Sequence, residues 1–169
     1  KHTIALIAPH FTMKRQLDDY YSKFYNDMFK RFNKLSEQNA NLAKQYSDWK
    51  TQITRLWNSI ELIDLQIPDV ENSNIELNDI FTAKISLFLG EISAEHIGIE
   101  MIIADKENNQ INDYTLIAPF ELISASNKRA DYEIKIKTSR AGVHNFAFRI
   151  YPKHPLMQHR MELPLVKWI

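Results

Sequence analysis

The stretch Phe81-Thr-Ala-Lys-Ile-Ser-Leu-Phe-Leu89 decides the fold class of this 169-residue chain. Apolar residues stand at every second position, with Thr82, Lys84 and Ser86 between them. Because successive side chains of a strand point to opposite faces, this period of two predicts a β-strand with one face toward a core. The same alternation predicts strands at 97–103, 132–136 and 146–150, with weaker candidates at 60–67, 111–117, 120–124 and 163–168.

Turn-forming residues separate these strands, and no helical pattern lies between them. The turns are Pro68-Asp69, 106–109, 126–128 and 139–142. Consecutive strands without helical crossovers pair antiparallel. About a hundred residues of this pattern predict an immunoglobulin-like β-sandwich, which we place at 61–169 as the second domain.

Residues 1–60 have a helical period instead and form the first predicted domain. Thr12 is a plausible N-cap, and the apolar residues of 13–35 follow at spacings of three and four. In an α-helix they would fill an arc of roughly 180°, whereas those of a second helix, about 40–58, fill roughly 100°. With a polar connection at 36–41, we expect a helical hairpin, and for the whole chain an α+β fold.

The first helix is too apolar for the second helix to cover alone. In a hairpin, part of its aromatic surface has no neighbour within the chain, and each exposed ring forgoes roughly 1.5–3 kcal/mol of burial. We therefore expect a missing partner on this helix, and a second copy of the chain is a further candidate. The rings concerned are Tyr20, Tyr21, Tyr25, Phe29 and Phe32.

Charge is balanced in total, with 21 basic and 21 acidic residues, but it is uneven along the chain. Residues 1–60 and 134–169 are basic and 61–133 are acidic. The basic residues stand singly, without the runs typical of phosphate-tracking surfaces, so we expect no nucleic-acid partner. The acidic and basic surfaces are expected to neutralise each other.

Composition excludes several classes of site. The absence of Cys removes disulfides and thiolate chemistry, and three Gly are too few for a Gly-rich phosphate loop. No stretch approaches the ~18 apolar residues that cross a bilayer. We expect no membrane partner and a cytoplasmic location.

The search for chemistry yields no catalytic, cofactor-binding or metal-ligating residue. There is no Gly-x-Ser-x-Gly elbow for a serine nucleophile. His154 and His159 have a spacing that would hold a metal only with a third ligand such as His144, and we interpret them as loop residues. A carboxylate pair is conceivable in an acidic cluster that we interpret as a solvated rim, namely Glu61, Asp64, Asp69, Glu71 and Glu76.

Three tryptophans leave a carbohydrate-binding alternative open. Trp49 and Trp57 stand at helical spacing and are expected in the core, while Trp168 near the end is undecided. Exposed, coplanar rings on one sheet would grip an α-glucan and indicate a carbohydrate-binding module. A hydrophobic patch bordering the helices would instead indicate a structural role.

Three segments resemble the C-terminal region of α-glucan (glycogen or maltodextrin) phosphorylases of the bacterial and archaeal type. The first is Ile7-Ala-Pro-His-Phe-Thr-Met-Lys-Arg-Gln-Leu-Asp-Asp-Tyr-Tyr-Ser-Lys-Phe-Tyr25. The second is Trp49-Lys-Thr-Gln-Ile-Thr-Arg-Leu-Trp-Asn-Ser-Ile60. The third is Phe146-Ala-Phe-Arg-Ile-Tyr-Pro-Lys-His-Pro-Leu-Met-Gln-His-Arg160, followed by Val166-Lys-Trp-Ile169. Gln16 and 161–164 depart from the family pattern.

The resemblance implies a parent enzyme that cleaves α-1,4-glucan with phosphate to give glucose 1-phosphate, using pyridoxal phosphate. In that family the cofactor lysine and the sugar- and phosphate-binding residues lie upstream of the segment present here, so none is carried over. The chain itself is then a non-catalytic C-terminal region with a stabilising or oligomerising role. Its exposed rings would pack against the catalytic lobes of the parent.

Overall fold

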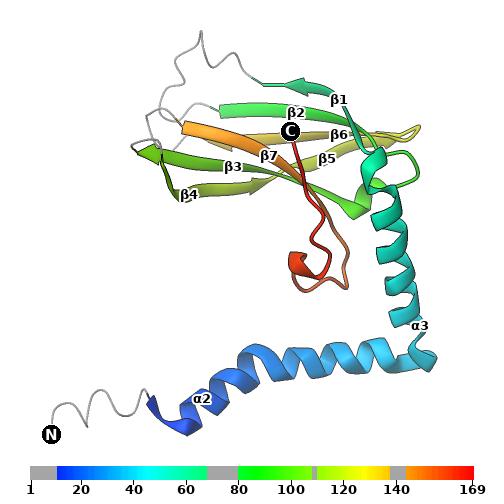
Figure 1. Cartoon of the computed structure of the whole chain (residues 1–169), viewed down its shortest axis with the longest axis vertical. Coiled ribbons are helices and arrows are strands. Elements are labelled where there is room, and N and C mark those ends of the chain that lie inside the picture. Colours follow the sequence, from blue (N-terminus) through cyan, green and yellow to red (C-terminus); the bar gives the residue numbers. More distant parts are fainter. Residues whose placement is uncertain (1–10, 68–79, 108–109, 138–143) are drawn as a thin grey trace, which may run out of the picture. The chain divides into compact units, whose positions relative to one another are not determined.

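The computed structural model describes residues 11–67, 80–107, 110–137 and 144–169. The chain divides into two compact units, 1–49 and 50–169 (Figure 1). The described part of the first unit is helical, and all the described strands belong to the second. The sequence boundary between residues 60 and 61 stays a prediction. The helical elements are α2 (Met13–Tyr20), η2 (Tyr21–Tyr25), α3 (Asn26–Leu56), η3 (Trp57–Ser59), η4 (Ala94–His96) and η5 (Arg160–Glu162).

The first helix begins where the sequence predicts. Thr12 is the N-cap of α2, and its hydroxyl oxygen accepts a hydrogen bond from the Arg15 N–H at 3.3 Å. A π-helical turn, η2, separates α2 from α3 and continues their path without a break. The backbone N–H of Asn26 bonds to the carbonyl of Tyr21, five residues earlier, which defines that turn.

The predicted helical hairpin is wrong. At residue 37 the backbone becomes extended, and the next three residues are left-handed, with φ of 51° at Gln38, 59° at Asn39 and 57° at Ala40. This bend interrupts α3, which the structure describes as one long element to Leu56 in place of the two helices expected. No residue of its first half, 26–36, is buried.

The second unit contains eight described strands, as many as the sequence predicts. All their pairings are antiparallel. They form two four-stranded sheets, ordered β1-β2-β6-β5 and β4-β3-β7-β8. The strands are β1 (Glu61–Gln66), β2 (Ile80–Phe88), β3 (Ile97–Glu107), β4 (Gln110–Pro119), β5 (Glu121–Ser126), β6 (Arg129–Lys137), β7 (His144–Pro152) and β8 (Lys167–Trp168).

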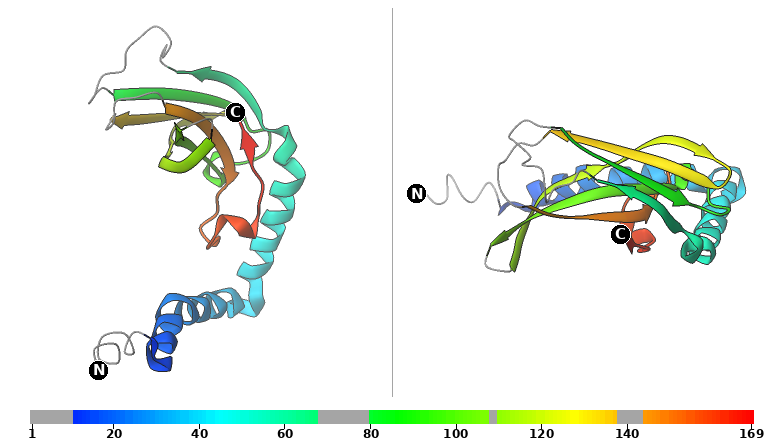
Figure 2. Two further views of the ribbon diagram at one scale, coloured as in Figure 1. Left: turned by 60° about the vertical axis from the view of Figure 1, so that its left-hand side comes forward. Right: turned by 90° about the horizontal axis from the view of Figure 1, so that it is seen from above.

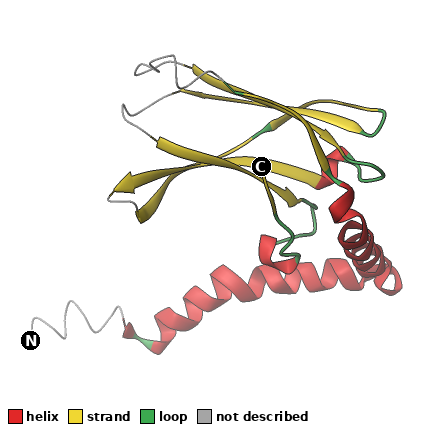
Figure 3. Cartoon of the chain, turned by 45° about the horizontal axis from the view of Figure 1, so that its top comes forward, coloured by secondary structure: helices red, strands yellow, loops and turns green. Residues whose placement is uncertain are grey.

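The two sheets lie face to face (Figure 3), and the buried apolar side chains of both form the core. The alternating residues of β2 are buried as predicted, with Ile85 and Leu87 inaccessible to solvent. Phe81 of β2 meets Phe146 of β7 edge to face, with ring centres 5.7 Å apart, which joins one sheet to the other. The Tyr132 hydroxyl donates to the Ala94 carbonyl at 3.2 Å and so satisfies a buried polar group.

The C-terminal segment leaves β7, forms η5 and returns as the short strand β8 beside β7 (Figure 2). Arg149 lies opposite Trp168 in this pairing. Ile169 and Phe148 exchange two backbone hydrogen bonds, and the Lys167 ammonium donates to the Ile60 carbonyl. The strand expected over 163–168 is therefore only two residues long, and Pro164, which has no N–H to donate, lies before it.

Candidate functional site

The described residues 11–36 carry an exposed apolar surface, which we name the aromatic stripe. No residue in this span is buried, and Phe29 exposes 64% of its surface. The rings predicted to lack a partner are all exposed. The stripe consists of Met13, Leu17, Tyr20, Tyr21, Phe24, Tyr25, Met28, Phe29 and Phe32.

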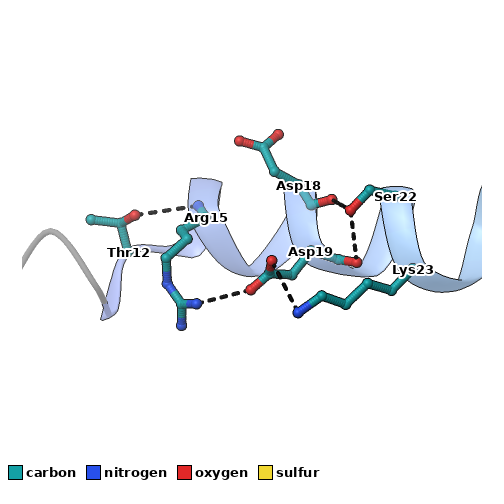
Figure 4. A network of polar contacts seen from close by, with 6 residues as sticks. All are labelled: Thr12, Arg15, Asp18, Asp19, Ser22 and Lys23. Atoms are coloured by element: carbon teal, nitrogen blue, oxygen red, sulfur yellow. Dashed lines mark hydrogen bonds and ion pairs between the residues drawn. The ribbon is translucent and has the colours of Figure 1, made fainter.

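Charged residues of α2 and η2 form a separate polar row. Asp19 accepts from Arg15 at 2.8 Å and forms an ion pair with Lys23 at 3.4 Å, each partner lying four residues away (Figure 4). Pairs at this spacing lie on one face of a helix and stabilise it modestly. Lys14 and Asp18 form a further pair at 2.7 Å, and its hydrogen bond and charge raise the pKa of Lys14.

A second candidate is a buried ion-pair cluster on the β4-β3-β7-β8 sheet, which we name the Glu100 cluster. Glu100 of β3 lies opposite Arg149 of β7 and exposes only 3% of its surface. Arg149 Nε donates to Glu100 Oε1 at 2.6 Å, and a second nitrogen of Arg149 contacts the same oxygen. Arg160 of η5 donates to both carboxylate oxygens, at 2.6 and 3.2 Å.

Two opposing effects act on the Glu100 carboxyl group. Burial alone would raise its pKa, because the charged form loses its water. The hydrogen bonds from Arg160 and Arg149, together with their positive charges, outweigh this effect and hold the pKa of Glu100 below its ordinary value. Glu100 is therefore ionised at neutral pH, with its two oxygens occupied by guanidinium groups. A carboxylate held in this way is not available as an acid or a base.

Aromatic rings complete the Glu100 cluster. The Arg160 guanidinium lies over the ring of Tyr151, 4.9 Å from its centre, and that of Arg149 lies over Trp168 at 5.5 Å. The Tyr151 ring occupies the space beside Gly98, where an added Cβ would come within 2.5 Å of the ring. Gly98 is thus the residue that lets Tyr151 lie against the sheet. The cluster joins β3, β7, β8 and η5, and its arrangement can tether the C-terminal segment to the sheet.

The histidines weighed as metal ligands and interpreted as loop residues make other contacts in the structure. The ring of His154 stacks on that of His96 with centres 5.5 Å apart, and its Nδ1 accepts from the Leu156 N–H at 3.1 Å. Burial and the neighbouring His96 lower the pKa of His154. Nδ1 of His159 accepts from the Met161 N–H at 3.2 Å and caps η5. The His144 side chain lies outside the described part, and the described residues bring no three potential ligands together.

The remaining sequence candidates are dispersed. Glu61 and Asp64 are exposed on β1, and the other three members of the acidic cluster, Asp69, Glu71 and Glu76, lie outside the described residues. Trp49 and Trp57 are buried as expected, whereas Trp168 exposes 56% of its surface. No described helix is both long and apolar enough to span a membrane.

Sequence reasoning missed the Glu100 cluster. One signal was available, because Glu100 is a charged residue within the apolar run 97–103, and such a residue needs partners when its strand is buried. Its partners are 49 and 60 residues away, so only the strand register and the return of the C-terminal segment reveal them.

Comparison with known proteins identifies the family to which this chain belongs. The sequence model of the family described as glycogen phosphorylase C-terminal domain matches residues 57–169, and the chain belongs to this family. The match begins at η3, covers both sheets and includes every residue of the Glu100 cluster.

Curated relatives align along almost the whole chain. A maltodextrin phosphorylase of Thermococcus litoralis is 23% identical over 176 residues, covering 99% of this chain and 20% of its own length. A glycogen phosphorylase of Mycobacterium bovis is 20% identical over 171 residues, covering 98% of this chain and 19% of its own length. The chain thus spans about a fifth of the length of these relatives.

Proposed function

We propose that this chain is a non-catalytic, structural region of a larger α-glucan phosphorylase. The observation that carries the proposal is the aromatic stripe, which exposes nine large apolar side chains within residues 11–36, a span with no buried residue. Exposed apolar surface of this extent marks an interaction site. Because the relatives are about five times longer, the rest of the parent chain is the natural partner. The contacts proposed are those of Tyr20, Tyr21, Tyr25, Phe29 and Phe32.

The parent activity proposed is phosphorolysis of α-1,4-glucan to glucose 1-phosphate with pyridoxal phosphate, in the cytoplasm. The names of the relatives and of the family support a phosphorylase activity on glycogen or maltodextrin. None of the residues described here is assigned a catalytic or cofactor-binding role. The buried carboxylate of Glu100 could in principle act as an acid or a base, but it accepts hydrogen bonds from two arginines.

The second unit is proposed to be an immunoglobulin-like sandwich. The order β1-β2-β6-β5 corresponds to the A-B-E-D sheet of that fold, and β3-β7-β8 to its C-F-G sheet, with β4 added beside β3. The edge-to-face contact of Phe81 with Phe146 supports packing of the two sheets across one core. The Glu100 cluster then tethers the C-terminal segment to one outer face.

The experiment compares the full-length parent enzyme with the isolated 169-residue chain. We expect amide hydrogen exchange over 13–36 to be slow in the parent and fast in the isolated chain, because only the parent covers the aromatic stripe. Phe29→Asp in the parent should lower its melting temperature, and Asn33→Asp, which adds the same charge at an exposed position off the stripe, should not. Equally fast exchange in both proteins would overturn the proposal.

The isolated chain also tests the role of a second copy. If the aromatic stripe is a homodimer interface instead, the isolated chain will sediment as a dimer, and its exchange over 13–36 will slow with concentration. A third outcome is a monomeric parent with slow exchange over 13–36, while the isolated chain associates as its concentration rises. In that case the association of the isolated chain is non-native.

A further inference from the structure

The π turn η2 changes which residues of the first helix share a face. An α-helix advances by about 100° per residue, whereas a π turn, with hydrogen bonds five residues long, advances by about 80°. Over the five residues Tyr21–Tyr25 the difference accumulates to about 100°. Everything after η2 is therefore rotated by about a quarter turn relative to an uninterrupted α-helix.

This rotation narrows the apolar surface. In an uninterrupted α-helix the apolar residues of 13–35 would occupy an arc of roughly 180°. With η2 included, Met28, Phe29 and Phe32 come into line with Met13 and Leu17, and the arc shrinks to about 120°. The apolar arc expected from the sequence, roughly half of the helix circumference, is therefore wider than the arc in the structure. The aromatic stripe is a single face.

Ring contacts within the helix support this alignment. Tyr20 lies 6.1 Å from Phe24 and 6.2 Å from Tyr25, measured between ring centres. A contact between residues four apart is ordinary in an α-helix, whereas one between residues five apart requires the wider turn. The π turn therefore brings Tyr25 back onto the face that Tyr20 and Phe24 occupy.

A side chain on the polar side donates a hydrogen bond to the backbone at the start of the π turn. The Ser22 hydroxyl donates to the Asp18 carbonyl at 2.7 Å and also contacts that of Asp19 at 3.3 Å (Figure 4). The Asp18 carbonyl also accepts a hydrogen bond from the backbone N–H of Tyr21, so the Ser22 hydroxyl is an additional donor to it. The row Arg15, Asp19 and Lys23 falls on the side away from the stripe by the same angular count.

We propose that η2 is the positioning element of a docking surface, aligning the aromatic stripe for one continuous apolar groove on the rest of the parent phosphorylase. This inference rests on the proposed function. Two observations select this occupant. The relatives contain about four times as much chain outside the matched region as within it. The stripe is also one-sided, so one surface suffices to cover it.

The test uses length changes in the full-length parent enzyme. Deletion of Lys23 removes one residue from η2 and lets the helix close as a continuous α-helix, with the stripe still aligned within about 10°. Insertion of one Ala after Lys23 rotates the second half by about 100°, which moves Phe29 and Phe32 off the stripe and leaves Met28 at its edge. Lys23→Ala is the matched control, since it removes only the exposed ion pair with Asp19.

We expect the deletion and Lys23→Ala to keep wild-type protection of amides 26–36 from hydrogen exchange. The insertion should reduce that protection by tenfold or more, since losing the cover of a single ring already costs about 1.5 kcal/mol, roughly a factor of ten. Equal loss in the deletion and the insertion, or protection that survives the insertion, overturns the role of η2. Wild-type parent with unprotected amides over 13–36 instead overturns the proposed function itself. If the amides are protected only when the parent is a dimer, a second copy covers the stripe. That result overturns the proposal that the rest of the same chain covers it.

Discussion

At the scale of single residues, Glu100 governs how the C-terminal segment is held. Removing one partner of a buried ion pair leaves the others desolvated and unpaired, which costs more than the pair itself contributes. Arg149 is mostly buried and Arg160 partly exposed, so we expect Glu100→Gln to lower the free energy of unfolding by about 2 kcal/mol. Urea unfolding of the chain measures it, and Glu121→Gln, at an exposed position of β5, is the control.

The depressed pKa of Glu100 predicts the pH dependence of this contribution. A carboxyl group whose pKa is lower in the folded than in the unfolded state stabilises the fold fully above its ordinary value of 4.5. That contribution is lost as the pH falls from 4.5 through the lowered pKa. The difference in unfolding free energy between wild type and Glu100→Gln should therefore be constant above this range and shrink below it. A difference that grows on acidification would contradict the arrangement.

The close approach of Gly98 on β3 to Tyr151 on β7 predicts that substitutions at these two positions are energetically coupled. A Cβ at Gly98 would meet the Tyr151 ring at 2.5 Å, so Gly98→Ala should destabilise the chain by about 1–3 kcal/mol through overpacking. In a Tyr151→Ala background the ring is gone, and the same substitution should cost far less. A double-mutant cycle of unfolding free energies gives the coupling. Equal costs in the two backgrounds would show that Gly98 is not kept open for Tyr151.

At the scale of elements, the bend in α3 stores backbone strain. Three consecutive residues without glycine, Gln38, Asn39 and Ala40, are left-handed, a conformation that costs roughly 1–2 kcal/mol per residue. Ala40→Gly should therefore raise the free energy of unfolding by about 1 kcal/mol, and Ala43→Gly, in the right-handed helix, should lower it by a similar amount. Far-UV circular dichroism during urea unfolding checks both signs. Destabilisation by both would mean that the bend is not left-handed in solution.

The sequence predicted the elements better than their connections. Strand alternation and helical spacing are local, so β2, β3, β6 and β7 could be placed from the residues alone. The interruption of α3 at 37–40 falls within the polar connection predicted at 36–41, but its left-handed backbone could not be predicted, because these residues contain neither Gly nor Pro. The π turn was invisible to a count that advances 100° at every residue. The Glu100 cluster depends on the register of β3 against β7, which no local pattern contains.

At the scale of the whole molecule, the arrangement of aromatic rings weighs against the carbohydrate-binding alternative. Among the described strand side chains, the aromatic rings with the largest exposure are Trp168 and Phe88, and they belong to different sheets. They cannot form the coplanar pair that would grip a glucan. One face of Trp168 is also occupied by Arg149.

Tryptophan fluorescence tests whether a sugar binds at Trp168, because Trp49 and Trp57 are buried and the exposed indole is that of Trp168. A sugar stacking on this ring would remove water from it and shift its emission to shorter wavelength. We expect no shift when the chain is titrated with maltoheptaose to millimolar concentration. If a saturable shift occurs in the wild type and disappears in Trp168→Ala, the indole is a sugar contact, and Arg149 then orients the ring for binding as well as tethering β8.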